Sequence, residues 1–450
     1  MLTADVHASD TAVLPRYLDV GYRKIDRGGG VWLYDAVGEA ILDACSGGAM
    51  TACLGHGPSP IADAAAAQAE HVPYVYEHFF SNEPRELLAA RMVDLVAPAM
   101  GRVRFCTGGS EANEMALRMA RSYHVERGDS ARWRIISPAQ AYHGATLGAL
   151  ALSGRSSLKG ALDRYLPAHL HLSPLSYRQD STGEAALAEL DRVIEEAGPE
   201  SVAAFFCEPV SGAAMPGYCP PAAFWEGLDE RRREHGFLVC FDEIVTGIGR
   251  TGSWLAADRL PIEPDIVSVG KGLGAGYAPL TAVLCREEVY AAFEQGSKAF
   301  EHGHTWDGAP LPCAAGLAVL DEIVERGLLD RVAMRGPSLL EELRYAVDEL
   351  DLVSDVRGRG FLLGIELVDP RDGARVLPPE VDAAMQLDLL ALERGLLVSS
   401  SHASADGVVG DQVVFAPAFT ASDAELAEMV ARLATTLSEL QARLVRELGP

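Results

Sequence analysis

Lysine is the scarcest charged residue in this chain: the 450 residues include 34 arginines but only four lysines. A reaction that needs a side-chain amine as nucleophile therefore has few candidates. Lys24, Lys159 and Lys298 stand in polar or loop-like stretches, which is typical of surface charges. Lys271 alone follows an apolar, strand-like run. If the protein uses an amine in its chemistry, the sequence favours Lys271.

Paired cysteines, a leader sequence and long apolar runs are also missing. None of the eight cysteines belongs to a CxxC pair, which argues against a disulfide framework or a zinc site and for a reducing compartment. The first residues lack the basic start and apolar core of a secretory signal. No charge-free apolar run reaches the roughly 18 residues of a membrane span. We therefore expect a cytoplasmic protein with no membrane partner.

An excess of positive charge is absent as well. The net charge is −26 and the isoelectric point is near 4.8, so a nucleic-acid partner is disfavoured electrostatically. Hydrophobic residues make up 48% of the chain and charged residues 23%, which is ordinary for a globular enzyme. The length alone predicts about two to four domains.

The middle of the chain alternates apolar runs with helical patterns. Helices are predicted at 85–96 and 110–126, and strands at 102–106, 133–137, 202–207, 238–241, 266–269 and 281–285. Strands that alternate with helices favour an α/β fold with a mostly parallel, doubly wound sheet.

The two ends of the chain follow other patterns. Near the N-terminus, two short strands joined by a turn are predicted within 31–45, and a helix at 61–70. Beyond Pro310, a smaller α+β unit is predicted, with helices at 313–325, 339–349, 381–394 and 422–446 and strands at 361–367, 396–399 and 412–415. Linker-like composition occurs at 369–379 and 399–411. We expect three parts: an N-terminal segment, 1–70, that packs with the small domain; a large domain, 71–325; and the small domain, 326–450.

Two strand ends carry ionisable residues to one edge of the predicted sheet. Strand 238–241 is followed by Asp242, and strand 266–269 leads to Lys271 in a glycine-rich turn. Ligands of open α/β sheets bind outside the carboxyl ends of the strands, so both side chains are expected to face one crevice. A carboxylate that keeps a pyridine nitrogen protonated, beside an amine that can form an imine, is the core of pyridoxal phosphate chemistry.

Both residues also have a plainer interpretation. Asp242 ends an apolar strand and needs a cationic partner, which an internal ion pair with Arg250 could supply instead of a pyridinium. Lys271 could bind the phosphate of a nucleotide, although Gly270-Lys271-Gly272 lacks the GxxxxGK[ST] pattern.

Two further motifs are weak when taken singly. Gly109 and Ser110 lie between a predicted strand and helix, where they could hold a phosphate at the helix N-terminus, or Ser110 could be only an N-cap. Tyr142 follows a strand and could stack on a flat ring, or be an ordinary aromatic at an interface.

The segment around residue 304 offers two kinds of ligand. His302 and His304 are spaced two apart, but no third metal ligand is evident nearby, so we expect no metal site. Thr305 as a hydroxyl donor to a phosphate is the sharper hypothesis.

Taken together, these motifs resemble the class III (ω-type) aminotransferases, which are fold type I pyridoxal phosphate enzymes. Their order and spacing are specific to the family even though each is short. The resemblance extends over nearly the whole chain and rests on residues 54–57, 109–114, 142–144, 208–210, 242–252, 270–273, 302–305 and 357–366.

The resemblance implies a role for each residue around a pyridoxal 5'-phosphate cofactor. Lys271 would form the Schiff base and transfer protons, and Asp242 would pair with the pyridine nitrogen. Tyr142 would stack on one face of the ring and Ile244 would pack on the other, with His143 beside the cofactor.

At the phosphate end, the resemblance assigns Gly109 and Ser110 as ligands. Thr305 would reach the phosphate from a neighbouring subunit, which implies a homodimer with shared active sites. Glu208 lies near the site in relatives and is a possible support residue.

Four positions depart from the family pattern. Gly108 replaces a common serine, which we interpret as a minor change, and Ala309 replaces the polar residue usual before the following proline. Ala145 and Asp423 stand where relatives often carry the arginines that bind a substrate carboxylate. A donor that is neutral or cationic at its far end, such as a diamine or an amino sugar, is the hypothesis that follows.

The predicted function is an aminotransferase that moves an amino group from a primary amine or ω-amino compound to an oxo acid. Racemases, aminomutases and decarboxylases of the same fold remain alternatives, and so does a non-catalytic binding protein. The intact pair of Lys271 and Asp242 favours an enzyme.

Overall fold

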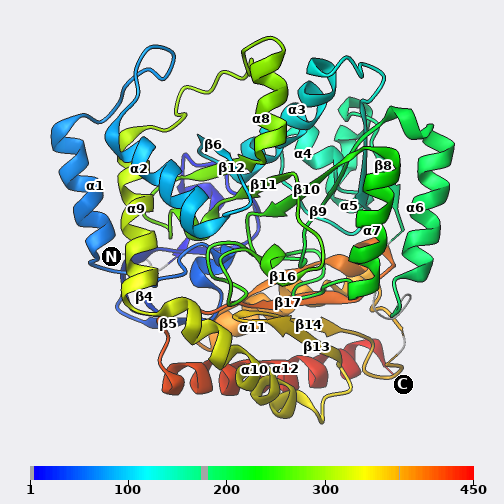
Figure 1. The fold of residues 1–450 in the computed structure, drawn as a ribbon. Helices are drawn as coiled ribbons and strands as arrows, with labels where there is room; N and C mark the ends of the chain where they lie inside the picture. The colour runs from blue at the N-terminus through cyan, green and yellow to red at the C-terminus, as the bar shows by residue number, and fades with distance from the viewer. Residues whose placement is uncertain (1–4, 174–180, 374, 450) are drawn as a thin grey trace.

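A seven-stranded sheet forms the centre of the molecule (Figure 1). The computed structural model describes residues 5–173, 181–373 and 375–449. In spatial order the strands of this sheet are β6 (Arg102–Cys106), β12 (Thr281–Cys285), β11 (Ile266–Val269), β10 (Leu238–Glu243), β9 (Val202–Cys207), β7 (Arg134–Pro138) and β8 (Leu170–Leu172). Neighbouring strands are parallel except at β12, which is antiparallel to both of its neighbours. The predicted mostly parallel α/β sheet is confirmed.

Helices cover both faces of this sheet because its central strands are apolar on both faces. Alternate residues of β9 point to opposite sides. Phe206 belongs to the cluster around α3 (Gly109–Glu126) on one side. On the other side Phe205 contacts Phe224 of α7 (Ala222–His235) with ring centroids 6.3 Å apart. The remaining helices of this part are α2 (Glu83–Arg91), α4 (Leu147–Ala151), α5 (Ser156–Lys159), α6 (Glu184–Ala197) and α8 (Glu287–Gln295).

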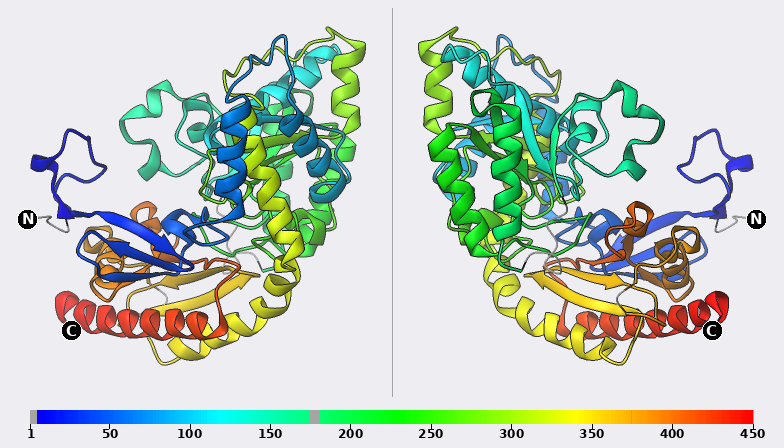
Figure 2. Two further views of the ribbon diagram at one scale, coloured as in Figure 1. Left: turned by 90° about the vertical axis from the view of Figure 1, so that its left-hand side faces the viewer. Right: turned by 90° about the vertical axis from the view of Figure 1, so that its right-hand side faces the viewer.

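The C-terminal third builds a second, smaller sheet of four strands. Its spatial order is β13 (Val353–Arg359), β14 (Leu362–Leu367), β17 (Asp411–Phe415) and β16 (Ser399–Ser401). Figures 1 and 2 show two long helices along its outer side. These are α10 (Leu328–Val347) and α12 (Asp423–Leu448), and α11 (Ala383–Glu393) packs nearby.

The N-terminal segment joins this C-terminal part through a third sheet. Strands β3 (Ile25–Gly29), β4 (Trp32–Asp35) and β5 (Ala40–Asp43) form an antiparallel meander, and β15 (Leu396–Leu397) pairs in parallel with β5. Helix α1 (Pro60–His71) packs instead against α9 (Pro310–Glu325). The division into parts at residues 70 and 325 stays a prediction, and the pairing of β5 with β15 supports it.

Two details of the predicted C-terminal part are wrong. The stretch 399–411 is no linker, because it contains β16 and a buried turn that begins at Ala403. Helix α10 begins at Leu328, well before residue 339, and continues through Pro337. A proline inside a helix removes one backbone hydrogen bond, and its ring crowds the preceding turn. The packing of the buried face of α10 outweighs this cost.

None of the helices in the described ranges is long and apolar enough to cross a membrane.

A buried ion pair connects the region of the seven-stranded sheet with the turn between β16 and β17. Arg155, just before α5, donates from Nε to Oδ2 of Asp406 over 2.7 Å, and both side chains are less than a tenth exposed. Arg155 also donates to the carbonyl oxygen of His402, and Asp406 accepts from the backbone N–H of Ser157. The turn after β16 is thereby attached to the segment that precedes α5.

Removal of one member of this pair leaves a charge without its partner in a buried position. Arg155→Met is expected to lower the free energy of unfolding by about 3 kcal/mol, at the low end for a broken buried pair because Ser157 still donates to Asp406. Urea denaturation measures the change. Arg192→Met, in an exposed pair with Glu196, is the control and should change nothing measurable. Equal effects of the two substitutions would contradict the structural role of the Arg155 pair.

Candidate active site

A cavity of about 550 Å³ opens at the carboxyl ends of β10 and β11. Asp242 is the second-last residue of β10, and Lys271 lies two residues after the end of β11. The two strands are parallel neighbours, with Asp242 opposite Ser268, so their ends meet at one edge. Both predicted residues therefore line the same cavity.

The carboxylate of Asp242 is 5% exposed and is held by three donors. Its Oδ2 is 2.8 Å from Nδ1 of His143 and accepts from Nδ2 of Asn113 over 2.7 Å. Its Oδ1 accepts from the backbone N–H of Ile244 over 3.0 Å. These contacts fix the orientation of the carboxylate towards the cavity.

Arg250 does not form the ion pair with Asp242 that the plainer interpretation offered as an alternative. Arg250 is buried, but its guanidinium donates to the carbonyl oxygens of Phe361 and Pro417 and to Oγ of Ser46. These contacts join Ser46 to the C-terminal part of the chain. They leave Asp242 available to another cation.

Asn113 is a site residue that the sequence did not single out. Its amide donates to Asp242 and to the carbonyl oxygen of His143, while its Oδ1 accepts from Oγ of Ser268 over 2.6 Å. Asn113 is 1% exposed, so this network is closed off from solvent. The residue falls inside the motif 109–114, but a contact to Asp242 across 129 positions has no local sequence signal.

Lys271 occupies an unusual backbone conformation for a residue with a side chain. Its φ of 41° lies in the left-handed region, and the residue begins a short 3₁₀ turn, Lys271–Leu273. Such conformations carry a conformational cost and are found preferentially at functional sites. Burial lowers the pKa of the Lys271 amine, and the nearby Asp242 carboxylate acts in the opposite direction.

Helix α3 begins at the cavity, with Gly109 and Ser110 as its first two residues. The N-cap is Gly108, so Ser110 is not the N-cap that one interpretation assumed. The first N–H groups of a helix have no acceptor within the helix and attract anions. A Cβ at Gly144 would lie 2.3 Å from Oγ of Ser110, so only glycine allows this approach.

The side walls of the cavity carry Tyr142, Ile244 and Glu208. The ring of Tyr142 is 43% exposed, whereas Ile244 is 9% exposed. Glu208 accepts the backbone N–H of Gly212 over 2.7 Å, and burial raises its pKa to about 7. A carboxyl group that is partly protonated near neutral pH therefore faces the cavity.

Three residues that the sequence associated with the site do not line the cavity of their own chain. Thr305 is exposed in the loop before α9. Ala145 donates its backbone N–H to Ser110. Asp423 begins α12 and pairs with Arg335 over 3.0 Å.

The two histidines at 302 and 304, for which no metal site is expected, make other contacts. His302 stacks on Phe300, with ring centroids 5.8 Å apart, and Nε2 of His304 lies 3.4 Å from the carboxylate of Glu111.

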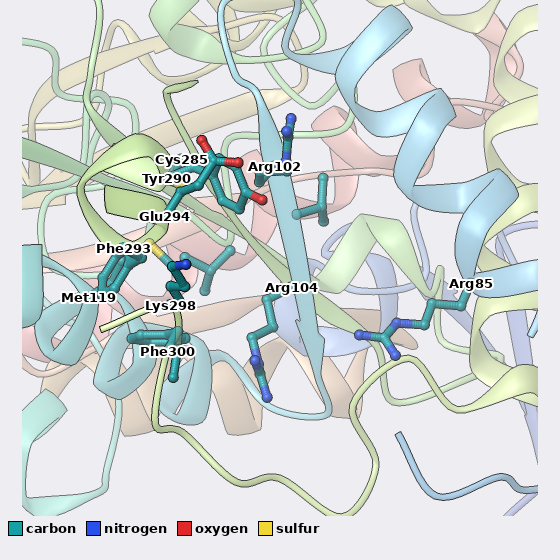
Figure 3. Close-up of a pocket in the computed structure, with 13 residues that line it drawn as sticks. Arg85, Arg102, Arg104, Met119, Cys285, Tyr290, Phe293, Glu294, Lys298 and Phe300 are labelled. Atoms are coloured by element: carbon teal, nitrogen blue, oxygen red, sulfur yellow. The ribbon is translucent and has the colours of Figure 1, made fainter. Parts of the chain in front are cut away.

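A second cavity of about 530 Å³ lies between β6 and α8 (Figure 3). Its wall combines aromatic rings, such as those of Tyr290 and Phe300, with basic side chains that include Arg102 and Arg104. Arg102 and Arg104 are already paired with Glu287 and Asp307. None of the predicted site residues lines this second cavity.

The raised pKa of Glu208 makes stability depend on pH. The folded protein holds the proton of Glu208 up to about pH 7, whereas an unfolded glutamate loses it near pH 4.5. Stability is therefore lost as the pH rises from 4.5 through 7. Glu208→Gln should remove this loss and stabilise the protein at pH 8 by up to about 3 kcal/mol relative to the wild type.

Urea denaturation at pH 5 and pH 8 measures the difference between Glu208→Gln and the wild type. Glu196→Gln, at an exposed position of α6, should leave the pH dependence unchanged. A Glu208 variant with the wild-type pH dependence would show that the carboxyl group is ionised throughout.

Comparison with known proteins identifies the family. The class III aminotransferase model matches residues 16–437. The uncharacterized aminotransferase YodT of Bacillus subtilis is 34% identical over 96% of this chain and 98% of its own length. The diaminobutyrate–2-oxoglutarate transaminase of Halomonas elongata is 31% identical over 99% of this chain and 95% of its own.

Solved structures agree with the sequence matches. A thermostable (S)-enantioselective omega-transaminase from Thermomicrobium roseum superimposes with a TM-score of 0.88 at 32% identity, covering 96% of each chain. A transaminase from the marine bacterium Virgibacillus gives a TM-score of 0.89 at 27% identity, over 97% of this chain and 98% of its own. The chain therefore belongs to the class III aminotransferases, pyridoxal 5'-phosphate-dependent enzymes of fold type I.

Proposed function

We propose that Lys271 is the catalytic amine of a transaminase that takes the amino group of a primary amine or ω-amino compound and passes it to an oxo acid. One observation carries this proposal: Lys271 and Asp242 line one cavity, and within the described ranges no lysine or arginine forms an ion pair with Asp242. The activities in the relatives' names are transaminations, which favours transfer over racemisation, aminomutation or decarboxylation.

The residues of the cavity fit pyridoxal 5'-phosphate. Asp242 is a buried carboxylate that lacks a permanent cation, and a protonated pyridine nitrogen would supply one. The start of α3, with Gly109 and Ser110, suits the phosphate. Tyr142 and Ile244 are the flat and apolar side chains available for the two faces of the ring.

The bound cofactor supplies an electron sink for the carbon that carries the amino group. The chain itself then has to orient the substrate and move protons. Lys271 is suited to that task because burial lowers the pKa of its amine towards the working pH, where it can both accept and return a proton. Asn113 and His143 hold Asp242 in position throughout.

Loss of the Lys271 amine should abolish both covalent attachment and turnover. After borohydride reduction of the holoenzyme, mass spectrometry should find a pyridoxyl group on the wild-type peptide that contains Lys271. Lys271→Ala should carry no such group and lose at least about 10³-fold in transamination rate, as removal of a catalytic nucleophile does. Lys298→Ala, at an exposed lysine, serves as the control. A label on any other lysine would contradict the assignment.

We also propose that two copies of the chain form a homodimer in which Thr305 of one copy reaches the phosphate site of the other. An aromatic surface beside Thr305 supports this arrangement. Trp306 contacts Tyr74 with ring centroids 5.5 Å apart and is 51% exposed. Phe79 and Phe80, a few residues after Tyr74 in the chain, contact each other and are 74% and 62% exposed. Adjacent exposed aromatic residues mark protein interfaces.

The oligomeric state tests this arrangement. The wild type should have twice the 48.0 kDa mass of one chain in light scattering. Phe80→Asp should shift the protein to monomers and reduce transamination in parallel, because desolvation of a new charge opposes association. Tyr345→Asp, at an 87% exposed residue of α10, is the control and should leave the dimer intact. A fully active monomer would contradict the shared site.

A cytoplasmic location is proposed as well. All eight cysteines are free, and seven of them are buried, as expected for a protein kept in a reducing compartment. Small-molecule amines and oxo acids are the proposed partners.

A further inference from the structure

An oxo-acid acceptor brings a carboxylate into the cavity, and that charge needs a binding partner. Arginine is the usual choice because its planar guanidinium forms two parallel hydrogen bonds to a carboxylate. The two positions where relatives often carry arginine hold Ala145 and Asp423 here, and neither lines the cavity. The carboxylate must therefore be bound by another group.

The cationic side chains on the cavity wall are few. Among the described residues that line it, Lys271 and Arg16 are the lysine and arginine residues. Lys271 is committed to the cofactor under the proposed function. Arg250 lies near Lys271, but the lining of the cavity does not include it. Its guanidinium already donates to Phe361, Pro417 and Ser46. Arg16 is the remaining cation.

Arg16 reaches the cavity from the N-terminal segment. The segment begins with the two-stranded ribbon of β1 (Asp5–Val6) and β2 (Tyr22–Arg23), which projects from the body of the molecule (Figure 2). The hydroxyl of Tyr22 accepts the backbone N–H of Tyr17 over 2.8 Å and so holds the chain beside Arg16. The loop between the two strands carries Arg16.

The guanidinium of Arg16 is available for a ligand. It lies over the ring of Tyr17, 5.3 Å from the centroid, and within the described parts of the chain it forms no ion pair with a carboxylate. The ring restricts the motion of the side chain without neutralising its charge. An exposed arginine without a carboxylate partner among the described residues, at the wall of this cavity, is a binding group for an anion.

We propose that Arg16 binds the carboxylate of the oxo-acid acceptor, and of any amino-acid donor that reacts in the same cavity. This inference rests on the proposed function and names the group that selects its carboxylate substrates. Under this proposal, Arg16 of the N-terminal segment takes the role that arginines at the positions of Ala145 and Asp423 often have in relatives. The proposal also extends the range of amino donors from amines without a carboxylate to amino acids. The donor and the acceptor react in the same cavity, so Arg16 can bind the carboxylate of either.

The test compares acceptors with and without a carboxylate in the holoenzyme. 1-Phenylethylamine, which has no carboxylate, is the donor, and pyruvate, 2-oxoglutarate and butanal are the acceptors. Arg16→Ala should raise KM for the two oxo acids by roughly 10- to 100-fold, the range for loss of a hydrogen-bonded charge partner. The same variant should leave kcat/KM for butanal within about two-fold. Arg16→Lys, which keeps the charge but not the paired donors, should fall in between.

Two control variants separate this role from general damage. Lys24→Ala removes an exposed cation of the same segment that does not line the cavity, and Asp423→Ala removes the carboxylate that pairs with Arg335. Both should retain the wild-type KM for pyruvate.

The outcomes that overturn the inference are distinct. An equal loss with butanal and with the oxo acids would show that Arg16 only supports the fold of the segment. An unchanged KM for pyruvate would show that another group, including one from a second copy of the chain, binds the carboxylate. Because turnover of butanal depends on Lys271 and not on a carboxylate, a loss confined to the oxo acids leaves the proposed function intact.

Discussion

The candidate site depends on one constraint, an enclosed carboxylate that pairs with no lysine or arginine in the described ranges of the chain. Asp242 is almost fully buried, and neutral or titratable donors surround it: the amide of Asn113, the imidazole of His143 and the N–H of Ile244. These three hydrogen-bond donors offset much of the free-energy cost of removing the carboxylate from water, but they do not neutralise its charge. The protein is therefore built to receive a positive charge at this point, and a pyridinium has the right sign and shape.

The same enclosure also acts on the Lys271 amine, which lines the cavity with Asp242. Desolvation favours the neutral form of Lys271, and the neutral amine is the reactive one. The two effects have one structural origin, because the parallel pairing of β10 with β11 brings both residues to the same edge of the sheet. One apolar sheet thus brings a carboxylate and an amine to the wall of one cavity.

The sequence allowed accurate prediction where a single local pattern determines the structure. The strands β6, β9, β11 and β12 were predicted to the residue. Three of them are short apolar runs, and β6 alternates arginine with apolar residues. The pair of Asp242 and Lys271 could be recognised for the same reason, since both follow such strands. The helices α6 and α7 were missed, although α6 has a strongly apolar face in the structure.

Other parts of the site depend on contacts that no local pattern encodes. The hydrogen bonds that link Ser268, Asn113 and Asp242 join residues that are far apart in the sequence. An asparagine at position 113 therefore could not be connected with its partners from the sequence alone. Arg16 stands in a segment with no motif, and only the course of the chain brings it to the cavity. Asp423 shows the reverse case, because a position inferred from the family pattern turned out to face Arg335.

The pairing of β5 with β15 also has a consequence for the order of assembly. These strands are separated by about 350 residues, so β5 leaves the ribosome long before β15 has been synthesised. The edge of β5 that β15 later covers must stay without that neighbour during most of translation, and closing so large a loop is slow. The N-terminal segment, which is made first, is thus among the last parts of the chain to be held in place.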